Sequence, residues 1–221
     1  MGHVDNSTLL HSNNGQALGQ IKVGQLLRKT LPPLFGEWLT LLDLRTTAEE
    51  GLLSSCDTLF FTFNYTMLLE EVYHVPISQV WHIHNSIADH KNGGFLIVGP
   101  DPTQQELLAN VTKYKSKDIT PSYIDEVNQE ISTSAKRVED RILREKDKFN
   151  QYKDIKRVIS MGFSFNDIDL PYIKKIIEVN EDKECLSFTV YWYSKGEKEY
   201  FKRHLQTIGV SEDKITPIHW C

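Results

Sequence analysis

Short apolar runs that end in polar turns divide much of the chain into strand-sized and helix-sized segments. Residues 57–63 and 79–84 are short and rich in aromatic or β-branched side chains, which is typical of buried strands. Residues 67–73, between them, have the length of a brief helix. The order strand, helix, strand predicts a parallel βαβ unit. A third short strand is predicted at residues 95–98, after a Gly-Gly turn.

The same alternation returns in the last third of the chain. Strands are predicted at 156–161, 186–193 and 214–220, and helices at 170–179 and 196–208. Because strands that alternate with helices pair in parallel and are covered by those helices, the sequence predicts an α/β fold. We expect a Rossmann-like, doubly wound, mostly parallel sheet.

A long central segment interrupts this alternation. Residues 104–152 carry apolar side chains at helical spacing on a charged and polar background, which predicts a helical insertion. Residues 1–20 are polar and rich in Gly, Asn and Ser, so we expect a loose N-terminal leader. The expected organisation is therefore a single α/β domain over residues 21–221 that contains the insertion.

Composition narrows the classes of partner and compartment. The formal net charge is −5, which argues against general nucleic-acid binding because that function needs a basic face. The three cysteines lie far apart, so neither a disulfide framework nor a zinc site is expected. The chain shows neither a secretory leader nor an apolar run of membrane length, so we expect a cytoplasmic protein that does not bind membranes.

Polar side chains follow three of the predicted strands at the point where each strand ends. Thr62 lies at the end of the first strand and Asn64 follows it, His84 ends the second, and Gly162 and Ser164 follow the first strand of the last third. Because the carboxyl ends of strands in an open parallel sheet line one edge, where ligands bind, we expect these residues to share one crevice. Amide and hydroxyl groups there suit sugar hydroxyls, and a glycine lets a ligand approach the backbone closely.

Each candidate also has a structural interpretation, which the sequence leaves open. Asn64 can cap the following helix, and His84 can be a buried histidine with satisfied hydrogen bonds instead of a general base. His82 and His84 lie two residues apart on an expected strand, so both rings would point to one face and could chelate a metal.

Together, three motifs resemble those of the bacteriophage abortive-infection AbiH family. They are Phe-Thr-Phe-Asn-Tyr-Thr at residues 61–66, His-Ile-His at 82–84 and Gly-Phe-Ser-Phe-Asn-Asp-Ile-Asp-Leu-Pro-Tyr at 162–172. The last motif is the most specific, and the resemblance runs from about residue 57 to the C-terminus. The family is in turn distantly similar to sirtuin-like domains, which bind and cleave NAD.

The resemblance implies a phage-defence protein with a sirtuin-like nucleotide pocket and an activity like that of an NAD glycohydrolase. It places Thr62, Asn64, Gly162 and Ser164 against NAD or a related nucleotide, which is substrate or ligand. It assigns catalysis to His84, as the base that takes a proton from water or a ribose hydroxyl, and to Asn64, which would hold that group in line. We expect no metal, and the partners would be a nucleotide together with a partner chain or a second copy of this chain.

Three features depart from the pattern that the resemblance implies. Asn85 stands where a glycine is expected after the histidine, Thr66 stands where sirtuin-like chains often carry aspartate, and residues 1–10 contain no turn of the Gly-Asn-Gly-Phe-Asp type. Such a glycine-rich turn would supply backbone N–H groups to a pyrophosphate. The alternative hypothesis is therefore a non-catalytic nucleotide-sensing or partner-binding module that lacks this turn.

Overall fold

The computed structural model describes residues 31–42, 57–98 and 137–220. The chain divides into two compact units, residues 1–136 and residues 137–221, and each unit is described by itself. Within the described ranges, no helix is both long and apolar enough to cross a membrane.

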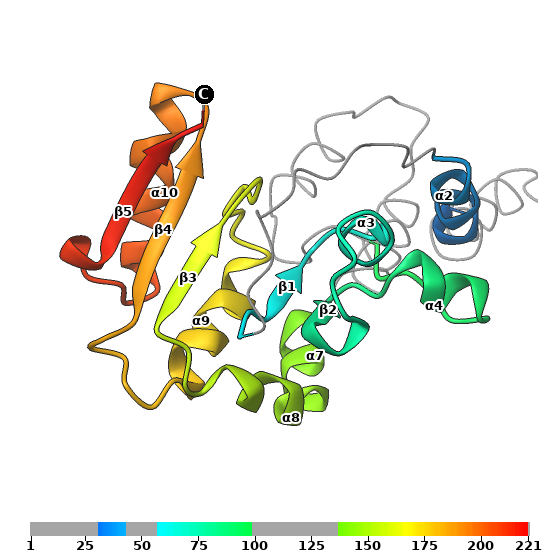
Figure 1. The fold of residues 1–221 in the computed structure, drawn as a ribbon, viewed down its shortest axis with the longest axis horizontal. Coiled ribbons are helices and arrows are strands. Elements are labelled where there is room, and N and C mark those ends of the chain that lie inside the picture. The colour runs from blue at the N-terminus through cyan, green and yellow to red at the C-terminus, as the bar shows by residue number, and fades with distance from the viewer. Residues whose placement is uncertain (1–30, 43–56, 99–136, 221) are drawn as a thin grey trace, which may run out of the picture. The chain divides into compact units, whose positions relative to one another are not determined.

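Unit 1 contains the predicted βαβ unit. Strands β1 (Phe60–Thr62) and β2 (Val80–His82) pair in parallel, with Phe61 opposite Trp81 (Figure 1). Helix α3 (Leu68–Glu71) and the 3-10 helix η3 (Ile77–Gln79) connect the two strands. The two strands and the helix between them are confirmed, although both strands are shorter than the sequence predicts.

Two further helices surround a small core in unit 1. Helix α2 (Leu31–Thr40) carries two prolines in its first turn. A missing N–H costs little there, because the N–H groups of the first turn have no acceptor within the helix. Helix α4 (Ile87–Lys91) follows the turn after β2. Leu39, Ile87 and Leu96 form the buried cluster that joins these helices.

The strand predicted at residues 95–98 is wrong, because these residues adopt no regular secondary structure. Side chains satisfy the backbone groups that a strand would use. The Asn85 amide donates to the carbonyl of Phe95 at 2.8 Å, and the Tyr65 hydroxyl donates to the carbonyl of Ile97 at 2.8 Å. The backbone N–H of Ile97 does reach the carbonyl of His84, at 2.9 Å, but one such bond does not make a ladder.

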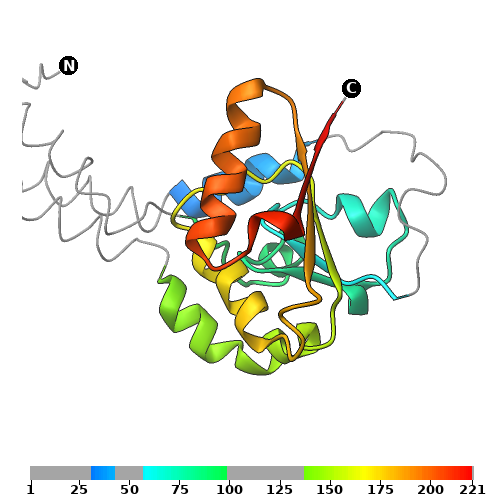
Figure 2. The ribbon, with the colours of Figure 1, turned by 90° about the vertical axis from the view of Figure 1, so that its left-hand side faces the viewer.

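Unit 2 holds a three-stranded parallel sheet in the order β3-β4-β5. The strands are β3 (Arg157–Ser160), β4 (Ser187–Trp192) and β5 (Ile215–His219). Helices α9 (Leu170–Val179) and α10 (Lys195–Thr207) connect them and lie on the same side of the sheet (Figure 2). All five elements that the sequence predicts for the last third of the chain are confirmed.

The alternation of side chains along β4 explains how this sheet binds its helices. Phe188 and Val190 are almost fully buried, whereas the residues between them are only half-buried. On the helices, Ile176, Phe201 and Leu205 are buried as well. One apolar face of the sheet is therefore covered by the apolar stripes of α9 and α10.

Only the end of the predicted helical insertion belongs to the described residues. It consists of α7 (Val138–Arg144), α8 (Lys146–Phe149) and the 3-10 helix η4 (Asn150–Tyr152). Phe149 and Tyr152 are buried, and the segment packs on α9. The predicted leader at 1–20 and the rest of the insertion lie outside the described residues, so the single domain over 21–221 stays a prediction.

The described parts of the chain are of the α/β class, with short parallel sheets of two and three strands. The class and the parallel pairing agree with the prediction. The Rossmann-like, doubly wound arrangement of one continuous sheet stays a prediction.

Candidate functional site at the end of β1 and β2

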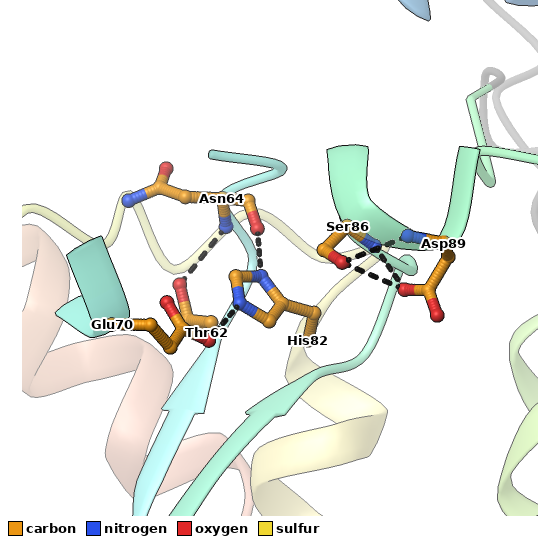
Figure 3. A network of polar contacts seen from close by, with 6 residues as sticks. All are labelled: Thr62, Asn64, Glu70, His82, Ser86 and Asp89. Carbon is orange, nitrogen blue, oxygen red and sulfur yellow. Dashed lines mark hydrogen bonds and ion pairs between the residues drawn. The ribbon is translucent and has the colours of Figure 1, made fainter. Parts of the chain in front are cut away.

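Asn64 occupies a turn directly after β1, and its backbone is held on both sides. Its N–H donates to Thr62 Oγ1 at 3.1 Å, and its carbonyl accepts a hydrogen bond from Nδ1 of His82 at 2.7 Å. Its side chain is exposed and extends away from this network (Figure 3). Helix α3 begins after Met67 and has no side-chain cap, so the interpretation of Asn64 as a helix cap is wrong.

The second ring nitrogen of His82 binds an acidic residue of α3. Nε2 lies 3.0 Å from Glu70 Oε1, and the two side chains are only 8% and 7% exposed (Figure 3). Both ring nitrogens therefore lie within hydrogen-bond distance of an oxygen. The geometry is that of a buried histidine–carboxyl pair, which holds the carbonyl of Asn64 in place.

Glu70 is a residue of this site that the sequence analysis missed. Its other oxygen, Oε2, is buried and makes no hydrogen bond to any described residue. A buried oxygen without a partner is uncommon, because its desolvation is not compensated. The only sequence signal for Glu70 was its position beside Leu68 and Leu69 on a helix between two predicted buried strands. This signal is weak, because most glutamates in such helices are exposed to solvent.

His84 lies in different surroundings from His82. Its side chain is only 2% exposed and packs beside the rings of Phe63 and Tyr65, at centroid distances of 5.6 and 6.1 Å. Strand β2 ends at His82 and the chain then turns, so the strand geometry behind the expected common face does not extend to His84. The described residues include no group of three His, Cys, Asp or Glu side chains that could hold a metal ion.

In the turn after His84, Asn85 stands at the position where the resemblance leads us to expect a glycine. Asn85 has a φ of 64°, in the left-handed region that glycine favours and that asparagine tolerates better than most residues. The next residues form a capping box that starts α4: the Ser86 N–H donates to Asp89 Oδ2 at 2.7 Å, and the Asp89 N–H donates to Ser86 Oγ (Figure 3). Asn85 therefore adopts a backbone conformation that a glycine at this position would adopt without strain.

The two remaining candidates lie in unit 2, in the turn after β3. Gly162 has a φ of 64°, and a Cβ built there would meet nothing within 4 Å. Ser164 is exposed, whereas its neighbour Phe165 is buried and packs on Phe163 and Phe201, at 4.7 and 5.0 Å. The buried phenylalanine fixes the turn and leaves the glycine and the serine at the surface.

The structure therefore gathers the predicted residues in two groups. Thr62, Asn64 and His84 belong to neighbouring segments at the carboxyl ends of β1 and β2. Gly162 and Ser164 belong to the carboxyl end of β3 in the other unit. That the two groups form one pocket stays a prediction.

Comparison with known proteins identifies one family. A sequence model of the family described as "Bacteriophage abortive infection AbiH" matches residues 4–192, a range that includes every predicted site residue. The match begins well before residue 57, where the expected resemblance starts, so the expected extent is corrected at the N-terminal side. The match stops before β5. No curated protein and no solved structure shows a significant match to this chain.

Proposed function

Because the chain belongs to the bacteriophage abortive infection AbiH family, we propose that it acts in phage defence by binding a nucleotide at the carboxyl ends of β1 and β2. The observation that carries this proposal is the exposed amide of Asn64, on a turn whose backbone is held at its N–H and at its carbonyl. A side chain presented from a fixed turn binds its ligand with little loss of conformational entropy.

The chemistry of the turn suits the ribose of NAD or a related nucleotide. A primary amide both donates and accepts hydrogen bonds, as a pair of sugar hydroxyls also does. Thr62 uses its hydroxyl oxygen to accept from the Asn64 N–H, so its part is to shape the turn. For unit 2 taken by itself, the proposal remains that Gly162 lets a ligand approach the backbone and that Ser164 donates to an oxygen of that ligand.

The burial of His84 favours the version of this function without catalysis. A general base has to come within about 2.6–3.2 Å of the proton that it takes. The His84 ring is only 2% exposed and lies beside Phe63 and Tyr65. A nucleotide would have to displace those rings before His84 could act, whereas Asn64 is accessible as it stands.

NAD cleavage is the second candidate, and it is supported by the contacts of His84 with the two residues that flank Asn64. A modest movement of the aromatic side chains on ligand binding would bring the imidazole to the same ribose that Asn64 holds. His84 would then take the proton and Asn64 would position the attacking group.

One experiment separates the two versions. The full chain is incubated with NAD, its melting temperature is measured, and the nucleotide is recovered by chromatography. Binding without cleavage raises the melting temperature and returns intact NAD, and saturation at 100 times Kd corresponds to about 2.7 kcal/mol of added stability. Cleavage consumes NAD in the wild type but not in His84→Ala.

The matched variants are Asn64→Ala and Asn92→Ala, since Asn92 is an exposed asparagine in the same unit at the end of α4. Asn64→Ala should abolish the shift and Asn92→Ala should keep it. A melting temperature that responds to neither NAD, ADP-ribose nor AMP would overturn the nucleotide proposal. Equal shifts in Asn64→Ala and the wild type would remove the proposed site.

A further inference from the structure

A hollow lies at the opposite end of the unit 2 sheet from Gly162 and Ser164. It has a volume of about 460 Å³, within the usual range of small-molecule sites. Its lining comes from the end of α9, the loops that enter β4 and β5, and the residues after α10: Ile177, Lys183, Glu184, Leu186, Phe188, Gly209, Val210, Ser211 and Lys214. Figure 1 shows the amino ends of β4 and β5 at this edge of the sheet.

The floor of the hollow is made of apolar side chains that are themselves mostly covered. Leu186 and Phe188 are each 2% exposed, and Val210 is 7% exposed. Helices α9 and α10 end at Val179 and Thr207, so neither helix extends over the loops that enter the next strands. The hollow is therefore a consequence of the chain path, and its floor can take the apolar part of a ligand.

The rim of the hollow carries positive charge that the protein does not neutralise by contact. Lys183 and Lys214 line it, and neither forms an ion pair with another described residue. The charge of Lys214 reaches the loop before β4: the hydrogen bond from Cys185 is the main cause that lowers the pKa of Asp182, and the charges of Lys156 and Lys214 lower it further.

Three features oppose an anion at this rim: the carboxylate of Asp182, which interacts with the charge of Lys214, the carboxylate of Glu184, and the carbonyls at the end of α10. Glu184 also lines the hollow, but it stands against two lysines. The carbonyls at the end of α10 would repel an anion, but they are already used: Leu205 accepts from the N–H groups of Ile208 and Val210, and Gln206 accepts from that of Gly209. The hydroxyl of Ser211 does not cap the short helix η5 (Glu212–Lys214) that follows it.

We propose that this hollow binds a small amphipathic anion, with its apolar body on Leu186, Phe188 and Val210 and its carboxylate or phosphate between Lys183 and Lys214. The Ser211 hydroxyl donates to the same anionic group. This site uses none of the residues of the nucleotide proposal and is independent of it.

The test is a titration of the full, isotope-labelled chain with octanoate, followed through backbone amide signals in two-dimensional NMR spectra. We expect signals of Leu186, Phe188, Val210 and Ser211 to move, with a Kd on the order of 1 mM or lower. Lys214→Gln and Lys183→Gln should each weaken binding about tenfold, the effect of losing one charge-assisted hydrogen bond. Lys174→Gln, an exposed lysine of α9 outside the lining, is the matched control.

Octanol and octyl phosphate complete the design, because they share the apolar body and differ in the head group. Octyl phosphate should move the same signals as octanoate, and octanol should bind at least tenfold more weakly. The absence of shifts with octanoate at about 10 times the expected Kd would overturn the proposal. Equal binding of octanol and octanoate by the wild type would also overturn it, whatever the stability of the variants.

Discussion

At the scale of single residues, the candidate site depends on one buried histidine–carboxyl pair and one exposed amide. His82 uses both of its ring nitrogens, one on Glu70 and one on the carbonyl of Asn64. The side chains of the pair are less than one tenth exposed, so neither partner can turn to water when the other is removed. The pair therefore fixes the shape of the turn after β1, and this turn exposes the side chain of Asn64.

The first prediction concerns the charge of this pair. Glu70→Gln keeps the size of the side chain but replaces a charge-assisted hydrogen bond by a neutral one. The free energy of unfolding should fall by about 1–3 kcal/mol in urea denaturation of the full chain. Glu71→Gln, at the exposed neighbouring position, is the control and should change it by less than about 0.5 kcal/mol. Equal effects of the two changes would show that the pair contributes nothing.

The second prediction concerns the backbone of Asn85. Its left-handed conformation costs most L-residues about 1–2 kcal/mol, and its side chain also donates to Phe95. Asn85→Ala should therefore lose more stability than Asn85→Gly, because glycine loses only the hydrogen bond. Melting temperatures should rank wild type above Asn85→Gly and Asn85→Gly above Asn85→Ala. An alanine variant as stable as the glycine variant would contradict the account.

At the scale of elements, periodicity was enough for the βαβ unit and for the strand–helix alternation of unit 2. These segments alternate or repeat their apolar residues as their final packing requires. The strand predicted at 95–98 is absent because carbonyls of this segment accept hydrogen bonds from the side chains of Asn85 and Tyr65. The sequence does not reveal these contacts, since the partners lie at least ten residues away. Glu70 could not be found for a similar reason, since only the folded chain places it against His82.

The third prediction concerns the start of α10. Glu197 accepts the N–H of Ser194 at 3.0 Å and that of Tyr193 at 2.8 Å, and these bonds lower its pKa below the ordinary 4.5. A lowered pKa in the folded state contributes stability above pH 4.5, which is lost as the pH falls through the folded value. Glu197→Gln should therefore melt below the wild type at pH 7.

The pH dependence of that difference is the decisive readout. As the pH falls through the lowered pKa of Glu197, the wild-type carboxyl takes up its proton, so the two proteins should melt closer together at acid pH than at pH 7. Glu199→Gln, on the exposed side of the same helix, should not reproduce this convergence. A gap between wild type and Glu197→Gln that stays constant from pH 7 to pH 3 would contradict the assigned hydrogen bonds.

At the scale of the whole molecule, the chain is an α/β protein of the AbiH family with functional candidates at the carboxyl ends of parallel strands. The sequence alone identified the family, and of the candidate residues Asn64, Gly162 and Ser164 lie in exposed turns. It did not reveal the burial of His84, because burial depends on where β2 ends and on the rings of Phe63 and Tyr65. The family and the exposed Asn64 are the two observations that support the proposal of nucleotide binding.

Hydrogen–deuterium exchange of the full chain with and without NAD tests this central claim most directly. The account predicts that NAD slows exchange of peptides covering residues 62–66, and that Asn64→Ala removes the effect. Exchange that NAD leaves unchanged at 62–66, in a wild-type chain that is folded by its melting curve, would contradict the claim.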